Sequence, residues 1–218
     1  GFEETPDGVY TTQFLIGPDG QEVGKYRRTM PAAPAFYEKI LEIDHHDLAW
    51  GNRVPVFETE LCTVGIVVCS ELFSPELSRV LALKGADVIL NPSGWITWTL
   101  RESWRSLARA RAIENLAYVG TCSQRYGREK LAGRISAPEE IVEDRDDDGI
   151  LTAEVDLDRL EWLRNTTETG NREEYEVIPG LSSGFEFHRR DGVEFSRRPE
   201  LYQPITEPRD TGAGSDCD

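Results

Sequence analysis

Hydrophobic and polar positions along the chain form alternating blocks, and those in its first third predict strands. Residues 9–16 are largely apolar and β-branched, residues 17–20 have the turn sequence Gly-Pro-Asp-Gly, and residues 21–28 fit a returning strand, so together they predict a β-hairpin. Residues 54–59 predict a further strand. Residues 63–69 are almost entirely apolar, which predicts a strand buried on both faces of a sheet.

A helix start follows the last of these strands. Ser74, Pro75 and Glu76 supply, in that order, an N-cap residue, a first-turn proline and a first-turn acid. They predict a helix that extends to about Lys84 and that Gly85 ends. A buried strand that leads into a helix is typical of α/β folds.

Strand-like and helix-like segments continue to alternate beyond this helix. The predicted strands are residues 86–90, closed by a turn at 91–94, then 117–122 and 150–156; the predicted helices are 37–41, 98–115 and 157–163. This alternation favours an α/β fold. The pattern thins from about Thr169. We therefore expect one domain over residues 1–168 and a C-terminal extension over 169–218 that ends in an acidic, disordered tail.

Composition narrows the possible partners of this domain. The net charge is −16, from 40 acidic and 24 basic residues, and only four of the basic residues are lysines. An acidic surface repels nucleic acids and anionic membranes, so neither is expected as a partner. Acidity with little lysine fits a protein adapted to high salt, where screening removes self-repulsion; an ordinary acidic cytosolic protein is the alternative. No apolar run is long enough to cross a bilayer.

The start of the chain and its cysteines point to a cytoplasmic protein. The first ten residues are acidic and mixed, unlike a signal peptide, and the absence of an initiator methionine suggests a fragment or a processed product. The cysteines are Cys62, Cys69, Cys122 and Cys217, and none forms a C-x-x-C pair. Four cysteines in 218 residues do not resemble a secreted disulfide scaffold, so a reducing compartment is expected.

Cys69 is the first candidate for chemistry. It ends a predicted buried strand just before a turn into a helix, where the helix dipole and backbone N–H groups favour the thiolate. The same geometry presents a hydrolase nucleophile at the top of a sheet. The alternative is a small apolar core residue, the usual role of a free cysteine. Cys62 and Cys122 lack the helix start that follows Cys69.

Five segments, in order, resemble the nitrilase superfamily of carbon–nitrogen hydrolases. Residues 64–79, which contain Cys69, closely resemble the nucleophile segment of its amidases. The other matching segments are residues 17–27, 85–93, 109–118 and 149–158. The match spans roughly residues 10–164. It implies that family's α/β fold, a four-layer α-β-β-α sandwich that is incomplete at its N-terminal side, and a homo-oligomer such as a dimer.

The resemblance also implies roles for residues. The family uses a Glu–Lys–Cys triad, often with a second Glu, in which the thiolate attacks a nitrile, amide or carbamoyl carbon and water hydrolyses the acyl-enzyme. Cys69 is the implied nucleophile, and Glu38 matches the second Glu of carbamoylase-like members; its alternative is a solvated acid. Ser93 and Trp95, just past a strand's end, are expected to bind substrate, as is Glu71 in the nucleophile segment.

Two departures from the family pattern stand out. The lysine motif Tyr-Arg-Lys is here Tyr26-Arg27-Arg28, so Arg28 occupies the place of the catalytic lysine. Arginine keeps the charge and can bind an oxyanion, but it cannot give up a proton. Lys25 lies three residues away on a predicted strand and should face the opposite side of the sheet.

The second departure concerns the first Glu of the triad. In the family it lies upstream of the hairpin, in a stretch that has no counterpart here, and Glu3 and Glu4 stand in a different context. Three hypotheses follow: an amidase-type hydrolase of a small linear amide or N-carbamoyl compound, a non-catalytic subunit for binding or assembly, or a truncated piece of a normal enzyme.

No cofactor or metal is expected. Residues 144–149 begin like a calcium-binding EF-hand loop, but its twelfth position is Val155 where a bidentate Glu is needed. His45 and His46 have no third ligand at a recognisable spacing, so a solvated loop is the better interpretation.

Overall fold

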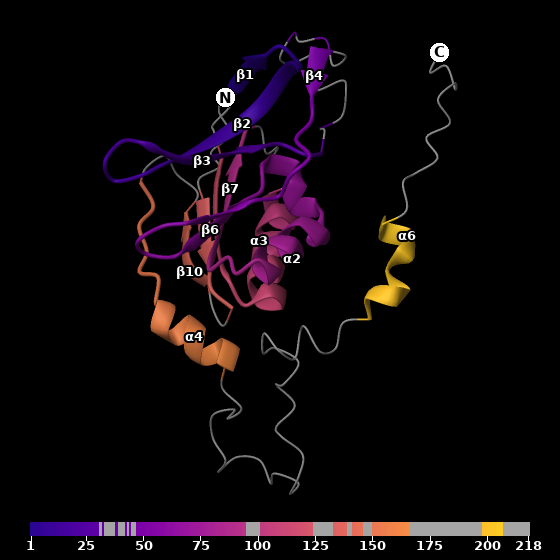
Figure 1. The fold of residues 1–218 in the computed structure, drawn as a ribbon. Helices are drawn as coiled ribbons and strands as arrows, with labels where there is room; N and C mark the ends of the chain where they lie inside the picture. Colours follow the sequence, from indigo (N-terminus) through magenta and orange to yellow (C-terminus); the bar gives the residue numbers. More distant parts are fainter. Residues whose placement is uncertain are drawn as a thin grey trace, which may run out of the picture.

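The computed structural model describes residues 1–30, 32, 38, 42, 44, 47–94, 101–123, 133–138, 141–145, 150–165 and 198–206. Within these ranges, two β-sheets pack face to face, and two helices cover the other face of the larger sheet (Figure 1). Several expectations lie outside the described residues. They are most of the helix predicted at 37–41, the start of that at 98–115, His45, His46, the acidic loop at 146–149, Trp95 and most of the C-terminal extension.

The smaller sheet is formed by the N-terminal part of the chain. Its strands are β1 (Phe2–Thr5), β2 (Gly8–Ile16), β3 (Glu22–Arg27) and the short β4 (Leu48–Ala49). β2 lies at the centre, antiparallel to β1 and β3 and parallel to β4. The predicted β-hairpin is confirmed, and Gly20 in its turn has a φ of 77°, a conformation that glycine adopts without strain.

The larger sheet has six strands in the order β10-β9-β8-β7-β6-β5. Their bounds are β5 (Val56–Glu58), β6 (Thr63–Ile66), β7 (Val88–Ser93), β8 (Tyr118–Ser123), β9 (Gly133–Ser136) and β10 (Ile141–Arg145). The three central strands, β6, β7 and β8, are parallel, and the outer strands pair antiparallel. The carboxyl ends of the parallel strands therefore meet at one edge, where ligands of open α/β sheets gather.

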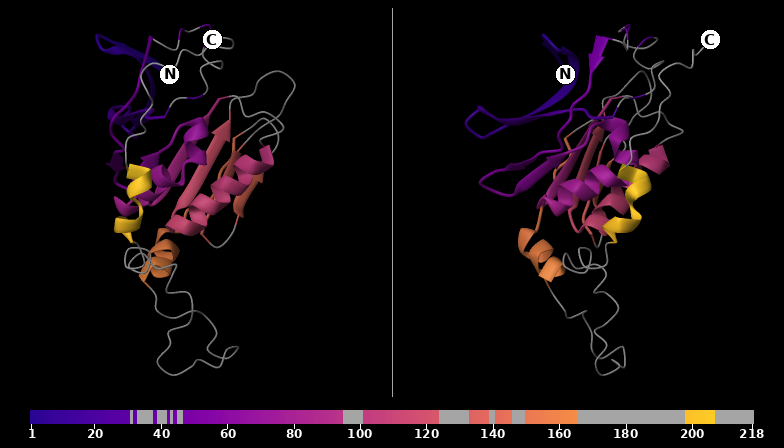
Figure 2. Two further views of the ribbon diagram at one scale, coloured as in Figure 1. Left: turned by 90° about the vertical axis from the view of Figure 1, so that its right-hand side faces the viewer. Right: turned by 45° about the vertical axis from the view of Figure 1, so that its right-hand side comes forward.

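The helices connect and cover these parallel strands. Their bounds are η2 (Cys69–Phe73, a 3-10 helix), α2 (Pro75–Leu83), α3 (Arg101–Asn115), α4 (Leu157–Asn165), η5 (Pro199–Leu201) and α6 (Gln203–Thr206). The predicted start of α2 is confirmed: Ser74 is its N-cap residue and Pro75 its first residue, although the serine side chain makes no capping hydrogen bond. Gly85 follows α2 with a φ of 97°, as expected of a helix-ending glycine. Figure 2 shows α2 and α3 beside each other on one face of the sheet.

The alternation of side chains along β6 and its continuation explains how the layers pack. Val67 joins the cluster beneath α2 and α3, together with Trp104 of α3 and Ile89 of β7. Ile66 and Val68 point the other way and meet the smaller sheet. Each fully buried side chain of this size contributes about 1.5–3 kcal/mol to folding. A segment that is apolar throughout is therefore required, because both of its faces are covered.

Three expectations about strands are corrected by the structure. The strand predicted at 63–69 ends at Ile66, and Cys69 opens η2 instead. β7 extends through Pro92 to Ser93; the proline is tolerated because β6 pairs with β7 only as far as Leu90. Residues 150–156 form no strand: their alternating pattern has no partner strand, and Ile150 is 83% exposed.

The order of the described layers is helices, six-stranded sheet and four-stranded sheet. The fourth layer of the expected sandwich is not among the described residues. On the outer face of the smaller sheet, Phe14 is 47% exposed and Ile16 is 55% exposed, so no described helix covers them. Among the described helices, none combines the length and apolar character that crossing a membrane requires.

Candidate functional site

Cys69 lies at a sharp bend between β6 and α2. Its φ is 52°, a left-handed conformation that costs a non-glycine residue about 1–3 kcal/mol and persists only where the surroundings hold it. Its thiol is half-buried and donates to the backbone carbonyl of Gly94, 3.7 Å away, just past the end of β7. The bend therefore presents Sγ at the edge where the parallel strands end. The bend is continued by the 3-10 turn η2, so α2 begins six residues after Cys69 and not directly behind it.

Asn91 holds this bend from the side of β7. Its side chain is fully buried, and Nδ2 donates to the carbonyls of Val67 at 3.0 Å and Cys69 at 3.1 Å. Its Oδ1 accepts hydrogen bonds from Trp104 Nε1 at 2.9 Å and from Ser93 Oγ at 3.0 Å. Ser93 thus lies close to the bend, as expected, but its hydroxyl proton is directed at Asn91. One amide ties the backbone of the bend to β7 and α3.

Glu71 holds the bend from the side of the smaller sheet. Its side chain is 0% exposed. Oε1 accepts from Tyr26 Oη at 2.8 Å, from Thr29 N at 2.8 Å, from Thr29 Oγ1 at 3.0 Å and from Met30 N at 3.0 Å. Oε2 accepts from Val68 N at 2.7 Å. This geometry leaves no face of the carboxylate open to a substrate, so it favours a structural role over the substrate contact expected from the sequence.

Arg28 brings a positive charge to the residue next to Cys69. Its side chain is buried, Nη2 donates to Ser70 Oγ at 2.5 Å, and Nε donates to the carbonyl of Met30 at 2.6 Å. A guanidinium fixed in this way can stabilise an oxyanion that develops nearby, although it cannot serve as a proton acceptor. The position expected to carry the family's cation is thus directed at the nucleophile segment.

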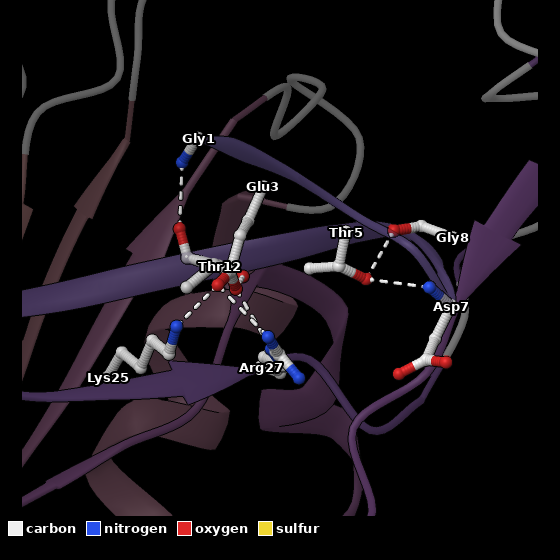
Figure 3. Close-up of polar contacts among 8 residues, drawn as sticks. All are labelled: Gly1, Glu3, Thr5, Asp7, Gly8, Thr12, Lys25 and Arg27. Carbon is white, nitrogen blue, oxygen red and sulfur yellow. Dashed lines mark hydrogen bonds and ion pairs between the residues drawn. The ribbon is translucent and has the colours of Figure 1, made fainter.

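Lys25 faces away from this site, as its position on the strand predicts. It pairs with Glu3 on the outer face of the smaller sheet (Figure 3). Arg27 donates to the same carboxylate from Nε at 2.8 Å, and Thr12 Oγ1 donates at 2.9 Å. Arg27, then Lys25, hold the pKa of Glu3 well below its usual value. Glu3 lies across the sheet from Arg28 and cannot take the place of the family's first Glu.

The remaining candidates are only partly visible. Glu38 is an exposed residue in helical conformation, and both of its neighbours lie outside the described residues, as does Trp95. Burial raises the pKa of Cys62, with a further contribution from Asp87, and burial also raises the pKa of Cys122. These two thiols are therefore poor candidates for a nucleophile. Within the described ranges, no group of three or more His, Cys, Asp or Glu residues could hold a metal ion.

Of the two residues that shape the bend, sequence reasoning missed Asn91 and singled out Glu71 for a different role. Asn91 follows three apolar residues in a buried strand, and a buried amide must find hydrogen-bond partners, so its position was a usable signal. The role of Glu71 depends on Tyr26, Thr29 and Met30, more than forty residues earlier in the chain. That contact between two sheets has no local signature.

Comparisons with known proteins match residues 1–165 to the carbon–nitrogen hydrolase family. Omega-amidase NIT2-A of Xenopus laevis is 29% identical over 171 residues, 74% of this chain and 61% of that protein. Deaminated glutathione amidase of Synechocystis sp. (strain PCC 6803 / GT-S) is 30% identical over 170 residues, 72% of this chain and 61% of that protein. The chain thus spans 61% of the length of these relatives.

A solved structure has the same fold. The crystal structure of Nit3 from Saccharomyces cerevisiae, a member of branch 10 of the nitrilase superfamily, superimposes with a TM-score of 0.64. Its sequence is 26% identical, and the alignment covers 80% of this chain and 64% of that chain. The two-sheet α/β architecture described above is therefore similar to that of a solved superfamily member.

Proposed function

Because this chain belongs to the carbon–nitrogen hydrolase family, as its motifs predicted, we propose that it hydrolyses a small linear amide or N-carbamoyl compound through a cysteine acyl-enzyme. The observation that carries the proposal is the conformation of Cys69: a strained, half-buried thiol held at the edge where the parallel strands end. Strain of this kind concentrates at functional sites, whereas a core cysteine has no need of it.

The proposed reaction has two stages. The Cys69 thiolate attacks the carbonyl carbon, and the tetrahedral intermediate collapses to a thioester as ammonia or an amine leaves with a proton. Water then attacks the thioester and releases the carboxylic acid and the free thiol. Arg28 stabilises negative charge on the intermediate, and Asn91 holds the backbone of Cys69 in its attacking conformation. Glu38 is proposed as the second Glu of the site, the position that the family resemblance gives it.

The names of the relatives support an amide as substrate. Both the Xenopus laevis and the Synechocystis proteins are named amidases. Ser93 and Trp95 follow the end of β7, close to the Gly94 carbonyl that the thiol contacts, and we propose that they border the substrate. We also propose a homo-oligomer, which the family resemblance implies, and a cytoplasmic location, for which the cysteine usage is the support.

A second candidate function is a non-catalytic subunit that binds a ligand or a partner protein. The arginine at position 28 favours it, because the guanidinium cannot exchange a proton as a lysine ammonium can. In this case the protein would keep the bend around Cys69 but would not hydrolyse a substrate.

Ammonia release tests the first candidate. The assay compares the unaltered chain, Cys69→Ala and the matched control Cys122→Ala on small amides, N-carbamoyl compounds and nitriles. We expect release by the unaltered chain and by the control, and a loss of about a thousandfold or more in Cys69→Ala, because the acyl-enzyme cannot form. Equal rates for the unaltered chain and Cys69→Ala would contradict the proposal. Ready alkylation of Cys69 without any release would favour the second candidate.

A further inference from the structure

The residues that carry the proposed chemistry lie on different layers. Cys69 follows β6 of the larger sheet, whereas Arg28 follows β3 of the smaller sheet. Their relative placement is therefore not set by one element but by whatever joins the two layers at this point. Two side chains do so: the Arg28 guanidinium, through Ser70, and the carboxylate of Glu71.

Building on the proposed function, we infer that Glu71 is a positioning residue, whose buried carboxylate fixes Arg28 against the Cys69 bend. Its Oε1 gathers donors from the residues that flank Arg28: Tyr26 on one side, and Thr29 and Met30 on the other. Its Oε2 binds Val68 N, immediately before Cys69. The carboxylate thus holds residues on both sides of Arg28 and the residue immediately before Cys69.

The chemistry of these contacts requires a carboxylate. All five partners of Glu71 are donors, and an ionised carboxylate is a pure acceptor at both oxygens. Burial, and after it the negative charge of Glu71, raises the pKa of the Tyr26 hydroxyl, which keeps that group protonated as a donor. A glutamine can satisfy the four donors at Oε1 only by turning its NH₂ toward Val68 N. Because both of these groups are donors, the hydrogen bond to Val68 N is lost and the two groups repel each other. An aspartate keeps the charge but is one methylene too short to span both layers.

Alkylation of Cys69 by iodoacetamide measures this placement without requiring turnover. The modified fraction of each cysteine is followed by peptide mass spectrometry at pH 7, so Cys62 and Cys122 report on the fold within the same molecule. Glu71→Gln should lower the Cys69 rate about tenfold, because the displaced guanidinium no longer lies against the bend that presents the thiol, while the rates of Cys62 and Cys122 stay unchanged. The Cys69 rate of Glu71→Asp should lie between the rates of the unaltered chain and of Glu71→Gln. Glu3→Gln, which alters a carboxylate that binds several donors on the outer face, should change none of the rates.

A double variant separates positioning from a general packing role. Arg28→Met alone should lower the Cys69 rate to a similar extent. If Glu71 acts through Arg28, adding Glu71→Gln to Arg28→Met should cause little further loss, because the cation is already absent. Losses that multiply in the double variant would overturn the inference.

An unchanged Cys69 rate in Glu71→Gln would also overturn the inference. Rates that rise together at Cys62, Cys69 and Cys122 would instead report that this variant has unfolded. If Glu71→Gln does not fold, Glu71→Asp and its combination with Arg28→Met give the same comparison. The proposed function is tested separately by ammonia release. Its failure would leave these alkylation results, and the inference they test, in place.

Discussion

Buried polar side chains around Cys69 account for the strain that its backbone bears. Asn91 and Glu71 bind the carbonyls and N–H groups on either side of the bend, and each has its hydrogen-bonding atoms paired. A buried polar group left unpaired costs about 1–3 kcal/mol, so relaxing the bend would break contacts of greater total worth than the strain it relieves. Cys69 keeps its left-handed backbone conformation because the hydrogen bonds of its neighbours hold the bend in place.

The acid stability of the smaller sheet should depend on Glu3. Its folded pKa is depressed by Arg27 and Lys25, so its contribution is present above its ordinary value of 4.5 and is lost as the pH falls below it. We expect Glu3→Gln to lower the urea midpoint at pH 7, and the difference from the unaltered chain to shrink at pH 3. Glu4→Gln, an exposed neighbour on the same strand, should show no such pH dependence. A difference that stays constant between the two pH values would contradict this account.

At the level of single residues, what could be predicted depended on local signals. The placement of Cys69 and the opposite facing of Lys25 and Arg28 follow from strand periodicity and the helix start at Ser74. The closed environment of Glu71 does not follow, because its partners come from another sheet. Sequence position alone therefore suggested a substrate contact where the structure has an internal bridge.

Among the secondary-structure elements, α4 shows how a surface helix is tied to the sheet. Leu160 of this helix packs against Tyr118 and Ala137. Arg164, near the end of the helix, donates Nε to the carbonyl of Leu116 at 2.9 Å and Nη2 to that of Ala86 at 2.9 Å. Its Nη1 pairs with Asp87, whose other oxygen accepts from Thr63 N at 2.9 Å. One arginine thus joins the amino-terminal ends of β6, β7 and β8.

Replacing this arginine should destabilise the domain. We expect Arg164→Met to lower the free energy of unfolding by about 3–5 kcal/mol, because it leaves a half-buried carboxylate and two buried carbonyls without their donor. Arg159→Met on the same helix loses an exposed contact with the Trp162 ring and should cost about 0.5–1 kcal/mol. Urea denaturation of both variants makes the comparison. Equal losses of unfolding free energy in the two variants would show that the buried contacts of Arg164 contribute no more than the exposed contact of Arg159.

The elements that were predicted correctly have strong local signals, and those that were missed depend on pairing. The hairpin β2–β3, the start of α2 and the body of α3 all follow from turn, cap or periodicity patterns. β9 and β10 have weak patterns and exist as strands because they pair with β8 and with each other. Residues 150–156 have the opposite property: an alternating pattern with no strand beside it.

For the molecule as a whole, the family and its α/β fold are confirmed, and they came from the order of motifs along the chain. The net charge of −16 is likewise a property of the entire chain and not of one site. Its effect on stability is independent of any single contact, because repulsion among many surface carboxylates acts over about 10 Å at moderate salt.

Salt should therefore stabilise this protein. Raising KCl from about 0.1 M to 1 M, where the screening length falls from about 10 Å to about 3 Å, should raise the melting temperature by at least about 4 °C. The same titration near the sequence pI of about 4.6, where the net charge vanishes, should have a much smaller effect. An equal response at both pH values would show that charge repulsion is not the cause.

The division of the site between two sheets has a consequence for how variation acts on it. The proposed nucleophile Cys69 belongs to one layer and the proposed cation Arg28 to the other, and Glu71 makes hydrogen bonds to both layers. We expect substitutions in the hairpin β2–β3, or around Phe57 where the sheets touch, to change how one layer packs on the other, and so to change the reactivity of Cys69 from a distance. Natural substitutions at the interface between the sheets should therefore change activity as strongly as substitutions of the residues nearest the thiol.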